Sequence, residues 1–95
     1  MDYVLMHMPE LYLINHETYV GMLRLSRGEI SSLYICPDFR RKGYASASIQ
    51  LLQEMYNELR LIVLSSNVIA INMYKKLGFE FREENSLIMV GEWKK

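Results

Sequence analysis

The chain has 95 residues, and its 11 Lys and Arg balance 11 Asp and Glu, so no long-range field favours nucleic acid or an anionic membrane as a partner. Hydrophobic residues make up 51% and no apolar run approaches the roughly 18 residues that span a bilayer, so we expect one globular domain over residues 1–95. A single cysteine, Cys36, excludes an internal disulfide framework, and the start lacks a secretory signal pattern, so a cytoplasmic location is expected.

Three runs rich in apolar and β-branched residues predict strands in the first part of the chain. They cover residues 11–15, 19–25 and 29–36, with a polar turn at His16 and Glu17 between the first two. Because the connections are short, these strands are expected to form an antiparallel meander.

The next segment, Arg-Arg-Lys-Gly-Tyr-Ala at 40–45, has the composition of a phosphate-binding turn. A glycine turn between a strand and a helix directs unpaired backbone N–H groups and the positive end of the helix dipole at one point. Gly43 allows close approach of a ligand, and Arg40, Arg41 and Lys42 add cationic donors. On the turn alone, a simply solvated basic surface remains the alternative.

Apolar residues then recur three or four positions apart from Ala45 to Leu59, which predicts a helix of roughly four turns. The short apolar run Leu61–Leu64 predicts a buried strand. The order strand, helix, strand predicts that residues 29–36 and 61–64 form a parallel pair.

A second helix is predicted over Val68–Leu77, after residues of N-cap type that end at Asn67. Gly78 suits the left-handed position after the helix, and Phe79 suits a Schellman motif. Residues 79–82 and 87–93 then predict a closing hairpin. The fold class is therefore mixed α/β (α+β), a central sheet with two helices.

Two motifs, one after the other along the chain, resemble those of the GNAT superfamily of acyl-CoA-dependent N-acetyltransferases. The stretch Leu-Tyr-Ile-Cys-Pro-Asp-Phe-Arg-Arg-Lys-Gly-Tyr-Ala at 33–45 resembles its signature Arg/Gln-x-x-Gly-x-Gly/Ala after a strand that ends near a proline. The second motif comprises Asn67, Ala70, Tyr74, Leu77, Gly78 and Phe79. The resemblance implies a GNAT-like fold, in which an antiparallel meander leads into a splayed parallel strand pair with two helices and a C-terminal hairpin.

The resemblance also implies a reaction and a co-substrate. A primary amine of a small molecule or protein would attack acetyl-CoA directly in a ternary complex, with no metal. The backbone of Leu33, Tyr34 and Ile35 would pair with the pantetheine arm, and the Ile35 N–H is the candidate oxyanion donor. The pyrophosphate would be held by Arg40, Arg41, Lys42, Gly43, Tyr44 and Ala45.

Tyr74 matches the family's general acid at the departing CoA sulfur. Because a phenol has a pKa of about 10 and a thiol about 8.5, we expect mainly a hydrogen bond to the developing thiolate, with late proton transfer. A core tyrosine is the alternative, since its helical spacing also suits a buried face. Asn67 matches a position that contacts the cofactor, and it also suits the helix cap.

Two further side chains have weaker assignments. Glu29 matches the strand glutamate that serves as general base in some members, although an exposed glutamate at a strand start is unremarkable. Cys36 could carry an acyl group, but a lone cysteine is more often an inert small hydrophobe.

The chain departs from the family pattern at its start, because only about ten residues precede the first predicted strand. It is therefore expected to be a short form that lacks most of the usual N-terminal strand and two helices, which form one wall of the acceptor site. A large acceptor or a second subunit in a homodimer could compensate. The predicted function is N-acetyltransferase, with a non-catalytic CoA-binding or regulatory module as the alternative.

Overall fold

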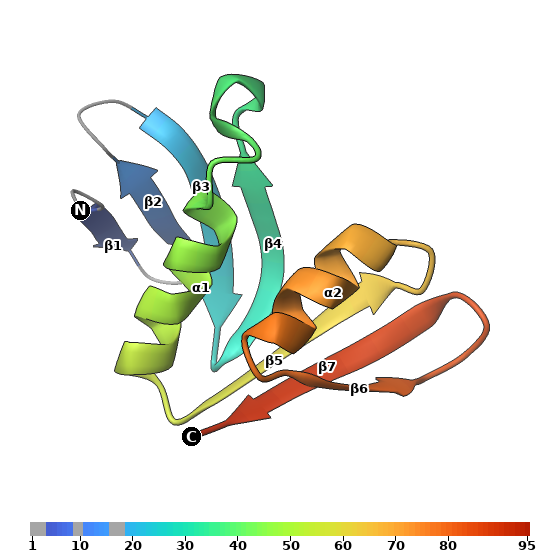
Figure 1. Ribbon diagram of the computed structural model, residues 1–95. Helices are drawn as coiled ribbons and strands as arrows, with labels where there is room; N and C mark the ends of the chain where they lie inside the picture. Colours follow the sequence, from blue (N-terminus) through green and yellow to red (C-terminus); the bar gives the residue numbers. More distant parts are fainter. Residues whose placement is uncertain (1–3, 9–10, 16–18) are drawn as a thin grey trace.

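Figure 1 shows the computed structural model, which describes residues 4–8, 11–15 and 19–95. Within these residues seven strands form one sheet in the order β1-β2-β3-β4-β5-β7-β6. The strands are β1 (Val4–Met8), β2 (Leu11–Asn15), β3 (Tyr19–Ser26), β4 (Glu29–Ile35), β5 (Glu58–Leu64), β6 (Glu80–Glu83) and β7 (Ile88–Lys94). The helices are η1 (Pro37–Phe39, a single 3₁₀ turn), α1 (Tyr44–Met55) and α2 (Val68–Lys76).

The antiparallel meander is confirmed and has one more strand than the sequence predicted. Strands β1 to β4 pair in succession, each antiparallel to the next. Strand β1, whose five residues pair in full with β2, was not predicted from the sequence. The turn predicted at His16 and Glu17 lies outside the described residues.

Strands β4 and β5 are parallel, as predicted, but they pair over a very short length. Their register contains only Glu29 with Arg60 and Ile30 with Leu61. Beyond these pairs the two strands diverge, which Figure 1 shows clearly, while β5 pairs with β7 along its full length from Glu58 to Leu64. The divergence leaves the facing edges of β4 and β5 without strand partners.

Helix α1 is shorter than predicted, and the assignment of Leu59 to it was wrong. The helix ends at Met55, and Tyr56 has extended backbone angles (φ −122°, ψ 152°). Leu59 belongs to β5, where it is 2% exposed and packs in the core. Leu59 lies four positions after Met55, the last helical residue, so it fits both the helical spacing and the alternation of the next strand. The sequence alone therefore did not show to which of the two elements it belongs.

Helix α2 has the predicted cap at each end. The Asn67 side chain accepts a hydrogen bond from the Ala70 N–H (3.3 Å). At the other end Gly78 has φ 97°, the Phe79 N–H donates to the Tyr74 carbonyl and the Gly78 N–H donates to the Lys75 carbonyl, both at 3.0 Å. These two bonds define the predicted Schellman motif, after which β6 and β7 form the predicted hairpin.

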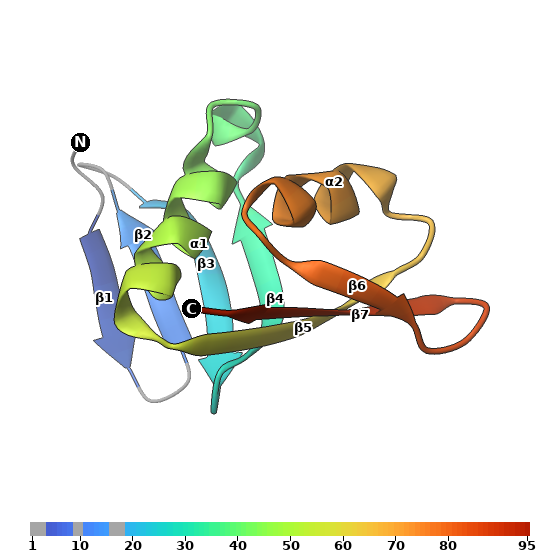
Figure 2. The same cartoon turned by 60° about the horizontal axis from the view of Figure 1, so that its bottom comes forward.

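Both long helices cover the same face of the sheet, which Figure 2 shows from below. Ile49 and Leu52 of α1 and Tyr74 of α2 share one buried cluster with Leu23 and Leu61 of the sheet. The helices are thus fixed relative to β4 and β5 by a common core. No helix among the described residues is both long and apolar enough to cross a membrane.

Candidate functional site

The divergence of β4 and β5 opens a cleft of about 590 Å³. Residues 30–35 of β4 and 61–63 of β5 form its two sides. Arg40 and Ala45 lie at one end, and α2 contributes Asn67, Ile69, Ala70, Met73 and Tyr74. Residues far apart in the sequence therefore meet in one elongated cavity.

The edge of β4 presents backbone groups to this cleft. The Cys36 N–H donates to the Val20 carbonyl of β3 (2.8 Å). Because backbone groups alternate sides along a strand, the N–H and C=O of Ile35 point the opposite way, toward the cleft. Arg40 meets Ile35 on this side, since its Nε donates to the Ile35 carbonyl (2.8 Å).

The turn after β4 contains two residues with left-handed backbone angles. Arg41 (φ 62°) and Gly43 (φ 85°) both have left-handed angles, and α1 begins directly afterwards without a side-chain cap. The first hydrogen bond of the helix runs from the Ala47 N–H to the Gly43 carbonyl (3.0 Å). The amides of the preceding turn have no partner within the helix, so they are suited to an anion.

The basic side chains of this turn have different surroundings. The Arg40 guanidinium is held by Ile35 and stacks over the Tyr34 ring, 5.5 Å from its centroid. Arg41 and Lys42 are exposed in the turn beyond the cleft lining. Arg40 is therefore held against β4, whereas the side chains of Arg41 and Lys42 are exposed to solvent.

Tyr44 was predicted as a cofactor-binding residue, and its ring is engaged within the protein. It packs edge-on against Phe39 with centroids 5.8 Å apart, in a small cluster with Val20 and Ile35. Its contribution to a ligand would therefore come from its backbone at the start of α1.

Tyr74 combines burial with access to the cleft. It is 5% exposed, and its ring packs against Phe79 with centroids 5.2 Å apart. None of the hydrogen bonds identified between described residues uses its hydroxyl, and Tyr74 lines the cleft. Desolvation by burial raises the pKa of Tyr74 to about 12, so the side chain is a neutral phenol, a hydrogen-bond donor, at neutral pH.

Glu29 is not brought to the other predicted site residues. It lies at the closed end of the cleft, outside its lining, and its carboxylate accepts a hydrogen bond from Arg60 Nη1 (3.1 Å). Both side chains of this pair are more than 40% exposed, so the pair is a solvated surface contact.

Sequence reasoning missed the apolar wall that α2 gives the cleft. Ile69 and Met73 lie one helical turn apart on α2, and Ile69 is 86% exposed. The four-residue spacing of Ile69 and Met73 in the predicted helix is the signal that could have revealed this wall from the sequence.

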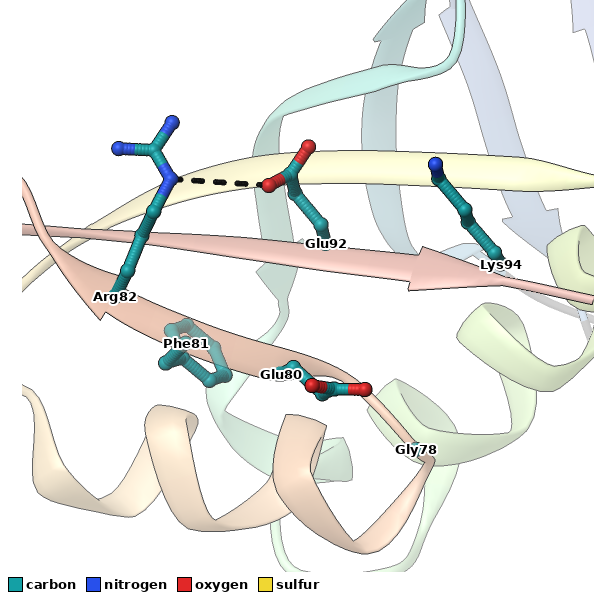
Figure 3. A pocket seen from close by; sticks show the side chains of 6 residues that line it. All are labelled: Gly78, Glu80, Phe81, Arg82, Glu92 and Lys94. Atoms are coloured by element: carbon teal, nitrogen blue, oxygen red, sulfur yellow. Dashed lines mark ion pairs between the residues drawn. The ribbon is translucent and has the colours of Figure 1, made fainter.

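A second hollow, of about 380 Å³, lies on the β6–β7 hairpin (Figure 3). Its charged side chains are Glu80, Arg82, Glu92 and Lys94, and Arg82 Nε lies 3.8 Å from a Glu92 carboxylate oxygen. A hollow lined by two acidic and two basic side chains does not suit a multiply anionic ligand. Among the described residues no three His, Cys, Asp or Glu side chains gather to hold a metal ion.

Comparison with known proteins gives a consistent result. Residues 8–79 match the model of the acetyltransferase (GNAT) family. An N-alpha-acetyltransferase of Sulfurisphaera tokodaii is 39% identical over 62 residues, which cover 59% of this chain and 37% of that protein. An acetyltransferase of Yersinia enterocolitica is 31% identical over an alignment that covers 90% of this chain and 67% of that protein.

The fold agrees with solved acetyltransferase structures. Arabidopsis thaliana Naa50, in complex with the bisubstrate analogue CoA-Ac-MVNAL, superposes with a TM-score of 0.75 at 22% identity. The match covers 90% of this chain and 72% of that one. The chain thus spans only about a third of its first two curated relatives, 37% and 34% of their lengths, and 67% of the Yersinia enterocolitica protein.

Proposed function

Because the chain belongs to the GNAT family of acetyltransferases, we propose that it is an acyl-CoA-dependent N-acyltransferase that moves the acetyl group of acetyl-CoA to a primary amine. The amine attacks the thioester directly within a ternary complex. The observation that carries this proposal is the cleft between β4 and β5. The open edge of β4 runs from the glycine turn that precedes α1 at one end to the wall of α2 that bears Tyr74.

The chain offers a matching surface to each part of acetyl-CoA. Along the open edge of β4, the backbone groups of Leu33 and Ile35 pair with the pantetheine amides as an added strand would. The backbone role expected for Tyr34 does not fit, because its N–H and C=O point toward Met22 of β3. The turn at 40–45 holds the pyrophosphate through backbone amides of the helix N-terminus, with Arg41 and Lys42 beside it. Ile69 and Met73 cover the apolar parts of the arm, and Asn67 contacts the cofactor while it caps α2.

Hydrogen-bond donors of the cleft would stabilise the charges that develop on the thioester during the transfer. The Ile35 N–H, which points toward the cleft, is the candidate donor to the oxyanion that forms on the thioester carbonyl. Tyr74 donates a hydrogen bond to the sulfur as it departs. Because burial raises the pKa of Tyr74 to about 12, the phenol is a weak proton donor, so Tyr74 stabilises the thiolate chiefly by hydrogen bonding.

The relatives support a choice of acceptor to test first. The Sulfurisphaera relative is an N-alpha-acetyltransferase, and the Arabidopsis structure holds an analogue that joins CoA to a peptide. We therefore propose the N-terminal amine of a peptide as the first acceptor to test, with a small primary amine as the second. Glu29 remains the proposed general base, although its pairing with Arg60 lies outside the cleft lining.

One observation favours a second candidate function, a non-catalytic CoA-binding or regulatory module. The cleft lining, as far as the described residues define it, contains no Asp, Glu or His to accept a proton from the attacking amine. Such a module would bind acetyl-CoA in the same cleft without turnover.

We further propose that the chain acts as one domain in the cytoplasm and that a second copy covers its helix-free face. Ile62 and Leu64 of β5 are 49% and 59% exposed. Because Leu61 faces the helices, the alternation of the strand directs Ile62 and Leu64 to the opposite face. Exposed apolar side chains that gather on one face are typical of an interface.

The proposed function is tested by the release of CoA thiol from acetyl-CoA in the presence of a peptide with an unblocked N-terminus or a small primary amine. The wild type should release thiol only when an amine is present. Tyr74→Phe should lower kcat by about 10- to 100-fold and leave the KM for acetyl-CoA nearly unchanged, because the hydroxyl acts on the leaving group. Tyr19→Phe, an exposed tyrosine on β3, is the matched control.

Full turnover by Tyr74→Phe would remove Tyr74 from the reaction. Binding of acetyl-CoA with no thiol release for either class of amine would favour the non-catalytic module instead.

A further inference from the structure

Helix α1 is joined to the end of α2 by a hydrogen bond between residues far apart in the sequence. The Gln53 side chain, in the last full turn of α1, donates from Nε2 to the Leu77 carbonyl at 2.8 Å. The bond is partly buried, and the two residues are 24 positions apart.

Leu77 belongs to the turn that carries Tyr74. The Leu77 N–H and the Phe79 N–H both donate to the Tyr74 carbonyl at 3.0 Å. Leu77 is also the C-cap of α2, so its own carbonyl is one of those that a helix leaves without an intrahelical partner. Gln53 supplies the donor that this carbonyl lacks and thereby fixes the last turn of α2 from outside.

The same helix that bears Gln53 begins at the turn proposed for the pyrophosphate. Gly43 precedes its first residue, and Gln53 lies about 14 Å along its axis from that end. One rigid element therefore touches the cofactor turn at its start and the Tyr74 turn near its end.

We propose that Gln53 is a positioning residue that sets the distance between the Tyr74 hydroxyl and the thioester sulfur. This inference rests on the proposed function of Tyr74. The phenol hydroxyl lies at the far end of its side chain, so a small tilt of the last turn of α2 displaces it from the sulfur. A displacement of this kind weakens stabilisation of the leaving group while the cofactor turn, at the other end of α1, remains intact.

The test uses the full chain and two substitutions at one position. Gln53→Met keeps the length and shape of the side chain but has no donor, and it should lower kcat about tenfold with the KM for acetyl-CoA within about twofold of the wild type. Gln53→Lys is less similar in shape but retains a donor at a helix C-terminus, and it should keep kcat within about threefold. Gln50→Met is the control, because Gln50 is an exposed residue on the same helix.

The pair of variants separates positioning from packing. If Gln53 only filled space, Gln53→Met would be the milder change and Gln53→Lys the more harmful one. Thermal unfolding should show that Gln53→Met remains folded, with a melting temperature lowered by about 4–8 °C for the loss of one hydrogen bond. Amide hydrogen exchange at Phe79 should become faster in Gln53→Met and remain unchanged in Gln50→Met.

Two results would overturn the inference in distinguishable ways. An active wild type with unchanged kcat in Gln53→Met, or with equal losses in the Met and Lys variants, would exclude the positioning role and leave the proposed function intact. A wild type that binds acetyl-CoA but transfers no acetyl group to any amine would overturn the proposed function and this inference together.

Discussion

At the scale of single residues, Tyr74 shows how burial suits a side chain for its proposed task. The ring packs against Phe79 and Phe81, with centroids 5.2 and 6.5 Å apart, in the main core cluster. Its position on the cleft lining leaves the phenol toward the cavity. A core tyrosine and a functional tyrosine are therefore compatible interpretations, because Tyr74 belongs both to the buried core and to the lining of the cleft.

The raised pKa of Tyr74 predicts a loss of stability at high pH. Between pH 10 and about 12 the unfolded chain has released this proton while the folded chain retains it, so the free energy of unfolding falls as the pH rises through this window. The loss amounts to at most about 3 kcal/mol. Urea unfolding of the wild type and of Tyr74→Phe at pH 9 and pH 11.5 should show that the variant loses less stability. Parallel losses would mean that the hydroxyl ionises in the folded protein at its ordinary pKa.

At the scale of elements, the helix and turn boundaries that carry a distinctive residue were predicted correctly, and those that carry none were not. The turn at 40–45 and both ends of α2 were predictable, because Gly43, Asn67 and Gly78 each have a local backbone role. The end of α1 was not, since no glycine or proline follows Met55 and the apolar spacing continues into Leu59. Strand β1 was missed because a short run beside a chain end carries little pattern, and its pairing partner defines it.

Substitutions at Gly43 can separate its two possible roles, which are to adopt a left-handed backbone conformation and to allow a ligand to approach closely. At φ 85° an alanine would strain the backbone by about 1–2 kcal/mol, whereas asparagine tolerates this conformation better. A Cβ at Gly43 would meet no protein atom within 4 Å, so the space beside it is open to a ligand. We expect Gly43→Ala to lower stability more than Gly43→Asn does, while both variants bind acetyl-CoA more weakly than the wild type.

Chemical unfolding and calorimetric titration of the two Gly43 variants measure these effects separately. Wild-type affinity in Gly43→Asn would show that glycine serves the backbone conformation alone, with no close approach of the ligand.

At the scale of the whole molecule, the site depends on a change of strand partner that the sequence does not reveal. Strand β5 pairs with β7 over seven residues and with β4 over two, so sheet twist carries β4 away from β5 and opens the cleft. The motifs contain residues that line the cleft, among them Arg40, Asn67 and Tyr74, and others that do not, such as Arg41 and Lys42. They did not reveal that Glu29 lies where the two strands are still paired, because that position depends on the length of the pairing.

The helix-free face predicts association between two copies of the chain. Sedimentation at micromolar concentration should show a dimer, since Ile62 and Leu64 are exposed apolar side chains that alternate to this face of β5. Leu64→Lys should shift the protein toward monomer, because a charge at the interface must be desolvated. Met55→Lys, at the exposed end of α1, should leave the dimer unchanged. A wild type that sediments as a monomer would contradict this part of the account.

The most direct test of the central claim is a calorimetric titration of the wild-type chain with acetyl-CoA. We expect one-to-one binding in the micromolar range, because the open edge of β4 contacts the pantetheine and the turn at 40–45 contacts the pyrophosphate. An absence of binding at millimolar acetyl-CoA would contradict it, since the cleft between β4 and β5 would then not be a cofactor site.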